Sequence, residues 1–527
     1  MVINSSAAQE DYWDDFQLED DDVEFIYTHL LETETPLTPQ EMITVLVEDR
    51  LERESKKVEE KRLSGGEIYL PAGEYQVDNS LVFPSLNWRQ AQVIDVRPGV
   101  NPDLGEFTVL KVRFENNEER EFASGLEDHI LNQAPASSDD DLPAAQVIFD
   151  TYGQSLIEGL EHGLGENPDF VRIAGRWFPR ALLIDINDGH LNLAEALLDM
   201  AGGGPLPTSD LLAQLDLPAN DNPKLVEFSL DLSLQEDDRF DEIGPAGQVF
   251  WFLKRLEPEG VRETPLFLQF TGMEYDRSIL DPDMLALESK LGDELSDLTD
   301  GQTGTVSDVG VSLLFPHWRA GTLPLTPQVS PFFPTAYETS RIRFMLVDGD
   351  SGEKFPGWVV RNQGYVFGLE EWYRQRELMP GSVVRIKRGK KSGEVVIKVD
   401  SKRSRRDWVR TVLVGADEGI VFATLKQLVA AAYDERMGIF VPDVQALDEV
   451  WGKHQNNRPP FERTVANVAR ELTKLNPQGH VHFVELYAAV NLVRRCPPGP
   501  IMALLASRPW FVHVGDLHFR FDDSAGE

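Results

Sequence analysis

The sequence predicts a multidomain protein of the α+β class, and three observations lead to this expectation. The chain has 527 residues, which at about 100–200 residues per domain corresponds to three or four domains. Segments with apolar residues at helical spacing are separated by runs of short, alternating β-type segments. A short aromatic hairpin pattern also recurs along the chain. We therefore expect several small units, each combining helices with a small sheet.

Composition places the chain among ordinary globular proteins. Hydrophobic residues make up 41% and charged residues 26%, and 89 acidic residues against 50 basic ones give a formal net charge of −39. Such a charge argues against unselective coating of nucleic acid or anionic membrane. The single cysteine, Cys496, excludes an internal disulfide framework and a cysteine-only zinc site. Residues 1–10 lack the features of a signal peptide, and no stretch resembles a membrane helix, so we expect a cytoplasmic protein without a membrane partner.

Residues 1–22 are expected to form an acidic, disordered tail. Nine acids and no base occur in the first 24 residues, and their mutual repulsion disfavours a folded state. The apolar residues that begin at Val23 then follow a helical period.

A second helix is predicted to begin near residue 39 within a first unit that spans residues 23–80. Thr38 suits the N-cap, Pro39 the first helical position and Glu41 the reciprocal carboxylate of a capping box. We expect this helix to run from Glu41 to about Glu60 and a short strand to follow within Gly65–Pro71.

Residues 81–133 predict a small β-barrel of the SH3-like or Tudor-like kind. Ala91–Val96 and Phe107–Phe114 are rich in β-type residues and alternate, and Pro98-Gly99 is a turn signal between them. Residues 134–145, rich in Pro, Ser and Asp, predict a linker.

The recurring hairpin is the most informative pattern in the chain. Each copy consists of a polar or proline turn, a Phe-x-x-Ile/Val strand, a small turn residue and a second strand with aromatic residues. The copies begin at Phe170, Phe240 and Phe511. Helical segments precede each copy, so the predicted order is helix, breaker, helix, helix and a two-stranded wing.

This order is the plan of the winged-helix domain. The segments Pro36-Leu-Thr-Pro39 and Pro205-Leu-Pro-Thr208 open the second helix in two of the units, and together with the hairpins they resemble the winged-helix domain of the RNA polymerase delta subunit type, called HARE-HTH. The resemblance covers about half the chain, and by analogy it implies contact with RNA polymerase. Its motifs are packing motifs, and the alternative is a set of unrelated α+β units with similar hairpins. The implied winged-helix-like units are residues 23–80, 146–190 (in part), 191–260 and 401–523.

Residues 261–400 predict a β domain with an N-terminal extension. Within Arg341–Lys398, a strand, a Gly368-Leu-x-x-Trp372 helix, a Leu378-x-Pro-Gly381 turn and a further strand follow one another. This succession resembles part of a B3-type DNA-binding pseudobarrel, which implies a B3-like barrel here.

Basic residues are concentrated in one part of this acidic chain. Residues 341–410 hold 17 bases and 9 acids, and a local basic stripe on an acidic body is typical of phosphate contact. Two bases that follow a C-terminal helix are added to the stripe. The predicted nucleic-acid-binding residues are Arg385, Lys387, Arg388, Lys390, Lys391, Lys402, Arg403, Arg405, Arg406, Arg410, Arg494 and Arg495. The alternatives are that the stripe docks on the protein's own acidic surface or tail, or on a protein partner.

Sequence signatures of catalysis are missing: the chain contains no Walker A motif, no Gly-x-Ser-x-Gly elbow and no His-Glu-x-x-His. Asp348–Gly352 resembles a shortened calcium loop without its remaining ligands, which favours a hairpin turn. His480 and His482 could form a zinc site with Cys496, but their position at a helix entrance favours capping and packing. The tryptophans are expected to be core anchors, among them Trp88, Trp177, Trp251 and Trp408.

These observations favour a non-enzymatic protein associated with DNA or transcription, with no catalytic residue, metal or cofactor. The sequence-independent contact would be made by the basic stripe, and the winged-helix units would grip partners or add DNA contacts. A protein-interaction scaffold that binds no nucleic acid is the first alternative. A restriction or modification component is the second, and it would require carboxylates brought together in space.

Overall fold

The computed structural model describes most of the chain. The described residues are 12–13, 16–63, 66–86, 89–100, 107–114, 117–127, 129–132, 145–215, 217, 222–296, 307–391, 393–415, 419–456 and 458–522, without the side chains of 54, 57–63, 401–405 and 455–456. The chain divides into two compact units, Met1–Asp185 with Asn220–Ser229, and Ile186–Ala219 with Leu230–Glu527.

The first compact unit contains a three-helix arrangement with a two-stranded hairpin. Its elements are α2 (Asp20–Thr33), α3 (Pro39–Leu63), α4 (Ala145–Gly165), β6 (Phe170–Ile173) and β7 (Arg176–Pro179). Leu37, between α2 and α3, pairs with Trp177 of β7 through backbone hydrogen bonds of 3.3 and 2.8 Å. The backbone at Leu37 therefore lies beside β7 as a third strand would, on the side away from β6.

The predicted capping box at the start of α3 is confirmed. The Thr38 amide donates to Glu41 Oε2 at 2.8 Å, and the Glu41 amide donates to Thr38 Oγ1 at 3.3 Å. The helix begins at Pro39 and continues three residues beyond the expected end, to Leu63.

The end of the expected acidic tail is part of the fold, which corrects the boundary at residue 22. Helix α2 begins at Asp20, and Asp22 is fully buried. The Arg50 Nε donates to Asp22 Oδ1 at 3.1 Å, and Arg53 pairs with the same oxygen at 2.6 Å. Because two guanidinium groups neutralise this carboxylate, an acidic residue can occupy a buried position. Residues 1–11, 14 and 15 of the expected tail lie outside the described residues.

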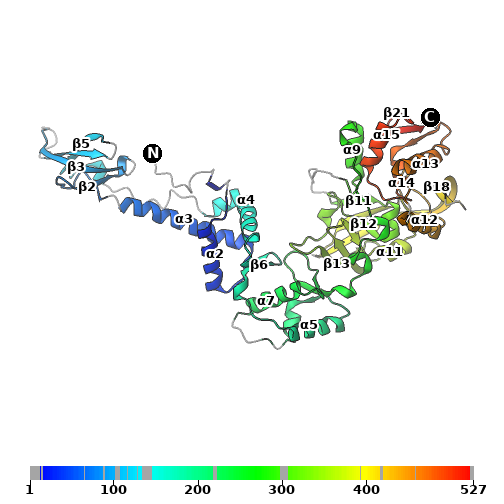
Figure 1. Cartoon of the computed structure of the whole chain (residues 1–527), viewed down its shortest axis with the longest axis horizontal. Coiled ribbons are helices and arrows are strands. Elements are labelled where there is room, and N and C mark those ends of the chain that lie inside the picture. Colours follow the sequence, from blue (N-terminus) through cyan, green and yellow to red (C-terminus); the bar gives the residue numbers. More distant parts are fainter. Residues whose placement is uncertain are drawn as a thin grey trace. The chain divides into compact units, whose positions relative to one another are not determined.

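A five-stranded sheet lies in the sequence between α3 and α4. Its strands follow one another in chain order: β1 (Glu67–Ile68), β2 (Ser80–Phe83), β3 (Arg89–Pro98), β4 (Thr108–Phe114) and β5 (Glu119–Ser124). Tyr69, Phe83 and Phe114 contribute to its buried core, and the strands are seen in light blue in Figure 1. The sheet begins at Glu67, so the boundary predicted at residue 81 falls inside it. The predicted linker lies outside the described residues up to 144, and α4 begins at Ala145.

A second set of elements has the same order as the first. It comprises α5 (Asp188–Met200), β8 (Leu206–Pro207), α6 (Thr208–Leu212), α7 (Pro223–Glu236), β9 (Phe240–Glu242) and β10 (Phe250–Leu253), with the strand order β8-β10-β9. Trp251 is fully buried, and its indole nitrogen donates to Asp231 Oδ1 at 2.9 Å. The prediction that Trp251 is a core anchor is confirmed, as it is for the buried Trp177. Trp88 lies outside the described residues.

The middle of the chain forms a seven-stranded, nearly closed barrel. The strand order is β11-β16-β17-β13-β14-β15-β12, and two short helices, α10 (Phe315–Ala320) and α11 (Glu370–Gln375), accompany the strands. Helices α8 (Glu259–Arg262) and α9 (Pro282–Leu291) precede them. The strands are β11 (Asp308–Ser312), β12 (Thr322–Pro324), β13 (Arg341–Asp348), β14 (Lys354–Val360), β15 (Tyr365–Phe367), β16 (Val383–Arg388) and β17 (Glu394–Val399).

The predicted turn after β13 is also present. Asp348 Oδ1 accepts hydrogen bonds from the amides of Asp350 and Ser351 at 2.8 and 2.9 Å, and its Oδ2 accepts from the Trp372 indole at 2.6 Å. Its carboxylate therefore organises a turn and fastens α11 to it.

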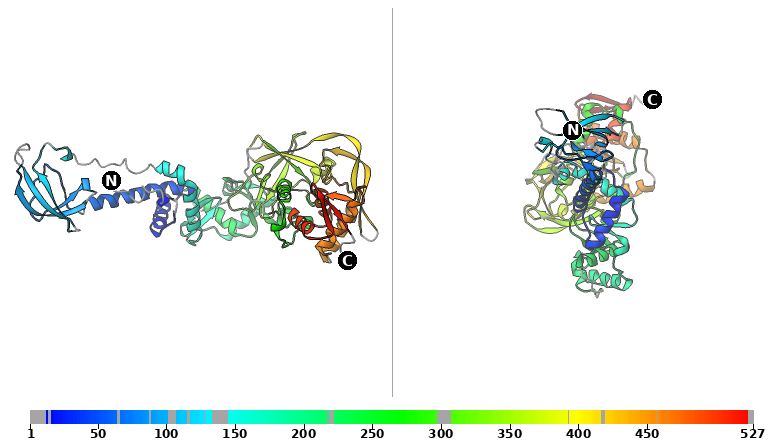
Figure 2. Two further views of the ribbon diagram at one scale, coloured as in Figure 1. Left: turned by 90° about the horizontal axis from the view of Figure 1, so that it is seen from above. Right: turned by 90° about the vertical axis from the view of Figure 1, so that its left-hand side faces the viewer.

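A long two-stranded ribbon, β18 (Ser401–Val414) and β19 (Ile420–Ala431), follows the barrel and leads to α12 (Val444–Asn456). It is drawn in yellow to orange in Figure 2. Val412 and Phe422 face each other across it and are buried in the largest core of the second unit. This pair anchors the end of the ribbon near its turn.

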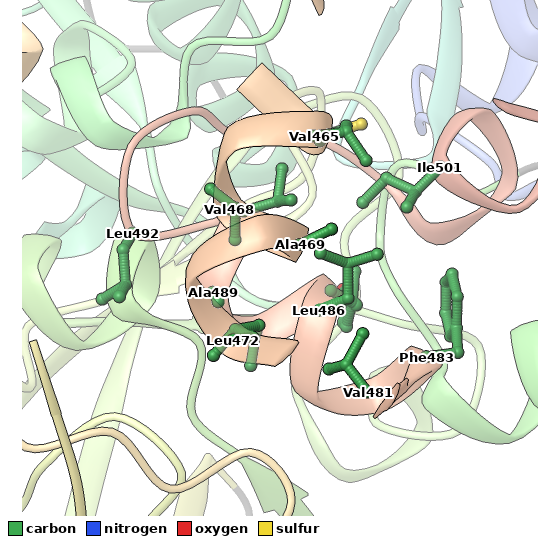
Figure 3. Packing of buried hydrophobic residues seen from close by; sticks show 14 of the residues in the cluster. Val465, Val468, Ala469, Leu472, Val481, Phe483, Leu486, Ala489, Leu492 and Ile501 are labelled. Atoms are coloured by element: carbon green, nitrogen blue, oxygen red, sulfur yellow. The ribbon is translucent and has the colours of Figure 1, made fainter. Parts of the chain in front are cut away.

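The C-terminal elements have the same order once more. They are α13 (Phe461–Thr473), β20 (His480–His482), α14 (Phe483–Val490), α15 (Pro498–Ser507), β21 (Phe511–Gly515) and β22 (His518–Phe521), with the strand order β20-β22-β21. Figure 3 shows Val465 and Leu472 of α13, Leu486 of α14 and Ile501 of α15 directed toward a common interior.

The structure is thus of the α+β class, with several separate sheets. Each of the three predicted hairpins is present, as β6–β7, β9–β10 and β21–β22. Among the helices of the described ranges, none combines the length and apolar character that a membrane crossing requires.

Candidate nucleic-acid interface

The first group of predicted contacts lies at the end of the β16–β17 hairpin. Strand alternation places Val384 and Ile386 of β16 in the barrel core, where both are fully buried. Lys387 therefore faces outward, and Lys390 and Lys391 lie in the exposed turn. We call Lys387, Arg388, Lys390 and Lys391 the basic turn.

Two glycines allow this turn to close tightly. The Gly389 amide donates to the Glu394 carbonyl at 2.9 Å, and a Cβ at Gly389 would lie 2.4 Å from that oxygen. Gly393 has a φ of 77°, in the left-handed region that favours glycine.

The basic turn forms one wall of a groove of about 400 Å³ in the second compact unit, which we call the basic groove. The segment Pro331–Thr335 and the β9–β10 turn at Pro245 and Ala246 form the other walls. The Ala246 amide donates to the Thr335 carbonyl at 2.6 Å, which holds these two walls together.

The basic groove is cationic because its bases have few acidic neighbours. Arg388 donates to the Pro331 carbonyl at 3.0 Å, which accepts a hydrogen bond without neutralising the charge. Within the described part of the chain, Lys390 and Lys391 have no ion pair. Glu394, the one carboxylate among the described lining residues, is paired with Lys354 at 2.5 Å.

Arg385 differs from the basic turn although it lies on the same strand. Its Nε pairs with Asp400 at 2.7 Å, and a second nitrogen lies 3.4 Å from Asp308. Two acids balance this guanidinium, so it adds little to a positive surface.

The second group of predicted contacts lies on the ribbon. Arg406 is exposed and has no acidic partner among the described residues. Arg410 is held inside the protein, because it donates to Glu485 Oε1 at 2.5 Å and to the Arg436 carbonyl at 3.0 Å. The side chains of Lys402, Arg403 and Arg405 lie outside the described residues, although their strand is described.

Trp408 departs from the expectation that it is a core anchor. The residue is 64% exposed on the ribbon, and Lys426 Nζ lies 5.1 Å from the centroid of its ring. The alternation of β18 is the signal that indicates this exposure, because Trp408 follows the exposed Arg406 at a spacing of two residues and so lies on the same face of the strand.

Arg494 and Arg495 are structural residues, which corrects their assignment as phosphate contacts. Arg495 is buried, and its guanidinium donates to Asp293 Oδ1 at 2.7 Å and to Glu294 Oε1 at 2.7 Å. Arg494 donates to the Pro459 carbonyl at 3.2 Å and lies 5.3 Å from the Phe461 ring centroid. The acids that hold Arg495 are about two hundred positions away in the sequence, so no local pattern could reveal them.

The acids around Arg495 form a buried ion cluster beside a cavity of about 260 Å³. His317 Nε2 lies 3.0 Å from Glu294 Oε1, and the Tyr487 hydroxyl donates to Asp293. Burial opposes the charged form of Glu294, but Arg495 and His317 outweigh it and hold the pKa of this carboxyl well below its usual range.

Asp434 also borders this cavity, and its Oδ1 accepts from the amides of Arg436 and Met437 at 2.8 and 3.0 Å. All three carboxylates at the cavity are therefore engaged by protein groups. Over the ranges that the structure describes, no group of three or more His, Cys, Asp or Glu side chains is arranged to hold a metal ion.

Comparison of the chain with protein-family models, with curated proteins and with solved structures finds no match.

Proposed function

We propose that this chain is a non-enzymatic nucleic-acid-binding protein that contacts phosphates through the basic groove. The observation that carries the proposal is the clustering of Arg388, Lys390 and Lys391 around one concave surface. Because Lys390 and Lys391 have no ion pair within the described residues, phosphate oxygens can take the place of the missing anions. A backbone-tracking contact of this kind reads charge rather than base sequence.

The remaining elements support a role in transcription. Three helices followed by a hairpin occur in each of three places. The second hairpin strand lies next to the segment that precedes the second helix, which is a short strand in two places and the Leu37 bridge in the first. This is the order expected of winged-helix domains. We interpret these places as winged-helix domains, the first of which carries the small β-barrel as an insertion between its second and third helices. Winged-helix domains bind DNA or proteins, and RNA polymerase is a partner by fold analogy alone.

We interpret the seven-stranded barrel with α10 and α11 as the B3-like domain. Its strand β16 carries the basic turn, and the turn of the neighbouring β9–β10 hairpin forms a wall of the same groove. A barrel of the B3 type and a wing would then act together on one stretch of nucleic acid. A place in the cytoplasm, with access to DNA, accords with this function.

A protein-interaction scaffold is the second candidate function, and one face of the ribbon favours it. Leu413 and Val421 face each other across the two strands, and both are exposed. Surfaces that bind proteins expose apolar side chains in contiguous groups, and this pair would form part of such a group.

The test compares two variants that each lose four positive charges. In the groove variant, Lys387, Arg388, Lys390 and Lys391 are changed to Gln. In the matched control, four exposed bases elsewhere are changed to Gln: Lys56, Lys224, Lys290 and Arg374.

Binding of fluorescent duplex DNA is followed by anisotropy at low salt. The groove variant should lose about 10- to 100-fold in affinity, and the control should stay within about 3-fold of the unaltered protein. Equal losses in both variants would mean that only the total charge matters, and no binding by the unaltered protein would favour the scaffold.

A further inference from the structure

The exposed indole of Trp408 lies beside two basic side chains on the ribbon. Cross-strand pairing places Arg406 opposite Leu428, Trp408 opposite Lys426 and Arg410 opposite Thr424. Alternate residues of a strand share a face, so Arg406 and Lys426 flank the indole on the face that carries it. Among the tryptophans that the structure describes, Trp408 alone is exposed.

We infer that Trp408 is a stacking platform for an unpaired nucleobase, so that the ribbon receives single-stranded nucleic acid. This inference rests on the proposed nucleic-acid function, and it specifies a single strand as the form of nucleic acid that the ribbon binds. Exposed aromatic rings beside cations are the arrangement with which proteins bind single strands, because every base has a flat face and every nucleotide a phosphate.

The two cations beside the indole are available to phosphates. Among the described residues, neither Arg406 nor Lys426 has an acidic partner, and Lys426 approaches the Trp408 ring. Lys426 lies over one face of the ring, and the 64% exposure of the residue leaves surface for a second planar group.

A groove of about 550 Å³ beside Trp408 determines how the strand must be oriented. Thr424, Asn476 and His480 line it with hydrogen-bonding groups, Asp407 and Glu435 add carboxylates, and Glu485 is paired with Arg410. Carboxylates repel phosphates but accept hydrogen bonds from the amino groups of bases. The bases therefore point into this groove, and the phosphates remain on the side of Arg406 and Lys426.

Base pairing would prevent this contact. In a duplex the flat faces of the bases are covered by their neighbours, and a side chain can stack on a base only after the base has left the helix. The ribbon should therefore prefer a single strand over a duplex of the same sequence.

The test uses three ligands of equal length: a single-stranded oligonucleotide, an abasic strand that keeps the phosphates and lacks the bases, and a duplex. The proteins are the full chain, Trp408→Ala, Trp408→Phe and, as a matched control, Leu428→Ala, which removes another exposed apolar side chain of the same face. Because both side chains are exposed, the variants should fold, and circular dichroism verifies this.

The unaltered protein should bind the oligonucleotide more tightly than the abasic strand. Trp408→Ala should weaken binding of the oligonucleotide by about 5- to 150-fold, the range that corresponds to the loss of one stacked base, and should leave binding of the abasic strand unchanged. Trp408→Phe should retain most of the affinity, and Leu428→Ala should stay within about 3-fold.

Equal effects of Trp408→Ala on the oligonucleotide and the abasic strand, or no effect on either, would overturn the stacking inference. If the stacking inference fails but the groove variant still loses duplex binding, the proposed function stands without a stacking platform at Trp408. If the unaltered protein binds none of the three ligands at low salt, both proposals fail together.

Discussion

Two buried carboxyl groups near the second hairpin, Glu242 and Glu257, are expected to make the stability of the protein depend on pH. Arg341 donates hydrogen bonds to both Asp241 and Glu257, at 2.9 and 3.0 Å, and Glu257 is buried with one oxygen that accepts no hydrogen bond. Burial first, and then the neighbouring Asp241, raises the pKa of Glu257 to about 8. Burial likewise raises the pKa of Glu242 to about 8.

Glu257→Gln should make stability less dependent on pH. In the wild type the folded chain keeps the Glu257 proton up to about pH 8, whereas the unfolded chain releases it near 4.5, so the free energy of unfolding falls as pH rises between these values. Glutamine resembles the protonated acid and does not titrate, so this fall in the free energy of unfolding is absent from the variant. One pKa unit corresponds to about 1.4 kcal/mol. From pH 5 to pH 8, the free energy of unfolding of the wild type should therefore fall by at least about 2 kcal/mol more than that of the variant.

Urea unfolding of both proteins at pH 5, 6.5 and 8 measures this difference. Glu259→Gln, at an exposed position nearby, is the control and should follow the wild type. A constant difference between Glu257→Gln and the wild type at all three pH values would contradict the raised pKa. The remaining pH dependence of the variant is expected to come in part from Glu242.

Arg495→Met should destabilise the protein by about 3–5 kcal/mol, because it leaves Asp293 and Glu294 buried without their counterion. Arg508→Met, which breaks an exposed pair with Glu462, should cost less than about 1 kcal/mol. Urea unfolding again provides the measurement. An Arg495→Met protein of unchanged stability but weakened DNA binding would restore Arg495 as a phosphate contact.

At the scale of elements, short-range features of the sequence predicted the structure well. The capping box of α3 joins Thr38 and Glu41, three residues apart, and the alternation of β16 separates inward Val384 from outward Lys387. The hairpin that starts at Phe170 turns at Ala174 and Gly175, both with positive φ. Each of these features depends on neighbours in the chain, so the residue types alone contain the information.

Long-range features could not be predicted in this way. Arg495 was assigned to phosphate because its partners, Asp293 and Glu294, come from a distant part of the chain. Trp408 is a different case, because its residue type favours a core position whereas the alternation of β18 places it on the same face as Arg406. Among the predicted contacts, the basic turn is exposed, whereas Arg410 is bound by Glu485.

Thr38→Ala should shorten or loosen the start of α3. The substitution removes the side-chain acceptor for the Glu41 amide, and loss of such a cap costs about 0.5–2 kcal/mol. Thr38→Ser, which keeps the hydroxyl, should restore most of the stability. Hydrogen exchange of the amides in the first turn of α3 reports the effect, and unchanged protection in Thr38→Ala would argue against the cap.

At the scale of the whole molecule, the charge is divided unequally. The chain carries −39 in total, yet Lys387, Lys390 and Lys391 have no ion pair among the described residues. On an acidic chain, a cationic groove concentrates the binding of a polyanion near its unpaired bases. Binding of nucleic acid is therefore expected to involve a small number of phosphate contacts at a defined place.

The salt dependence of duplex DNA binding tests this central claim most directly. Each neutralised phosphate contributes about −0.9 to the slope of the logarithm of affinity against the logarithm of salt concentration. The groove variant, which lacks four charges, should have a slope shallower by about 2 to 4 than that of the wild type, and the matched control should keep the wild-type slope. A groove variant with the wild-type slope, or a wild type whose affinity does not change with salt, would contradict phosphate contact at the basic groove.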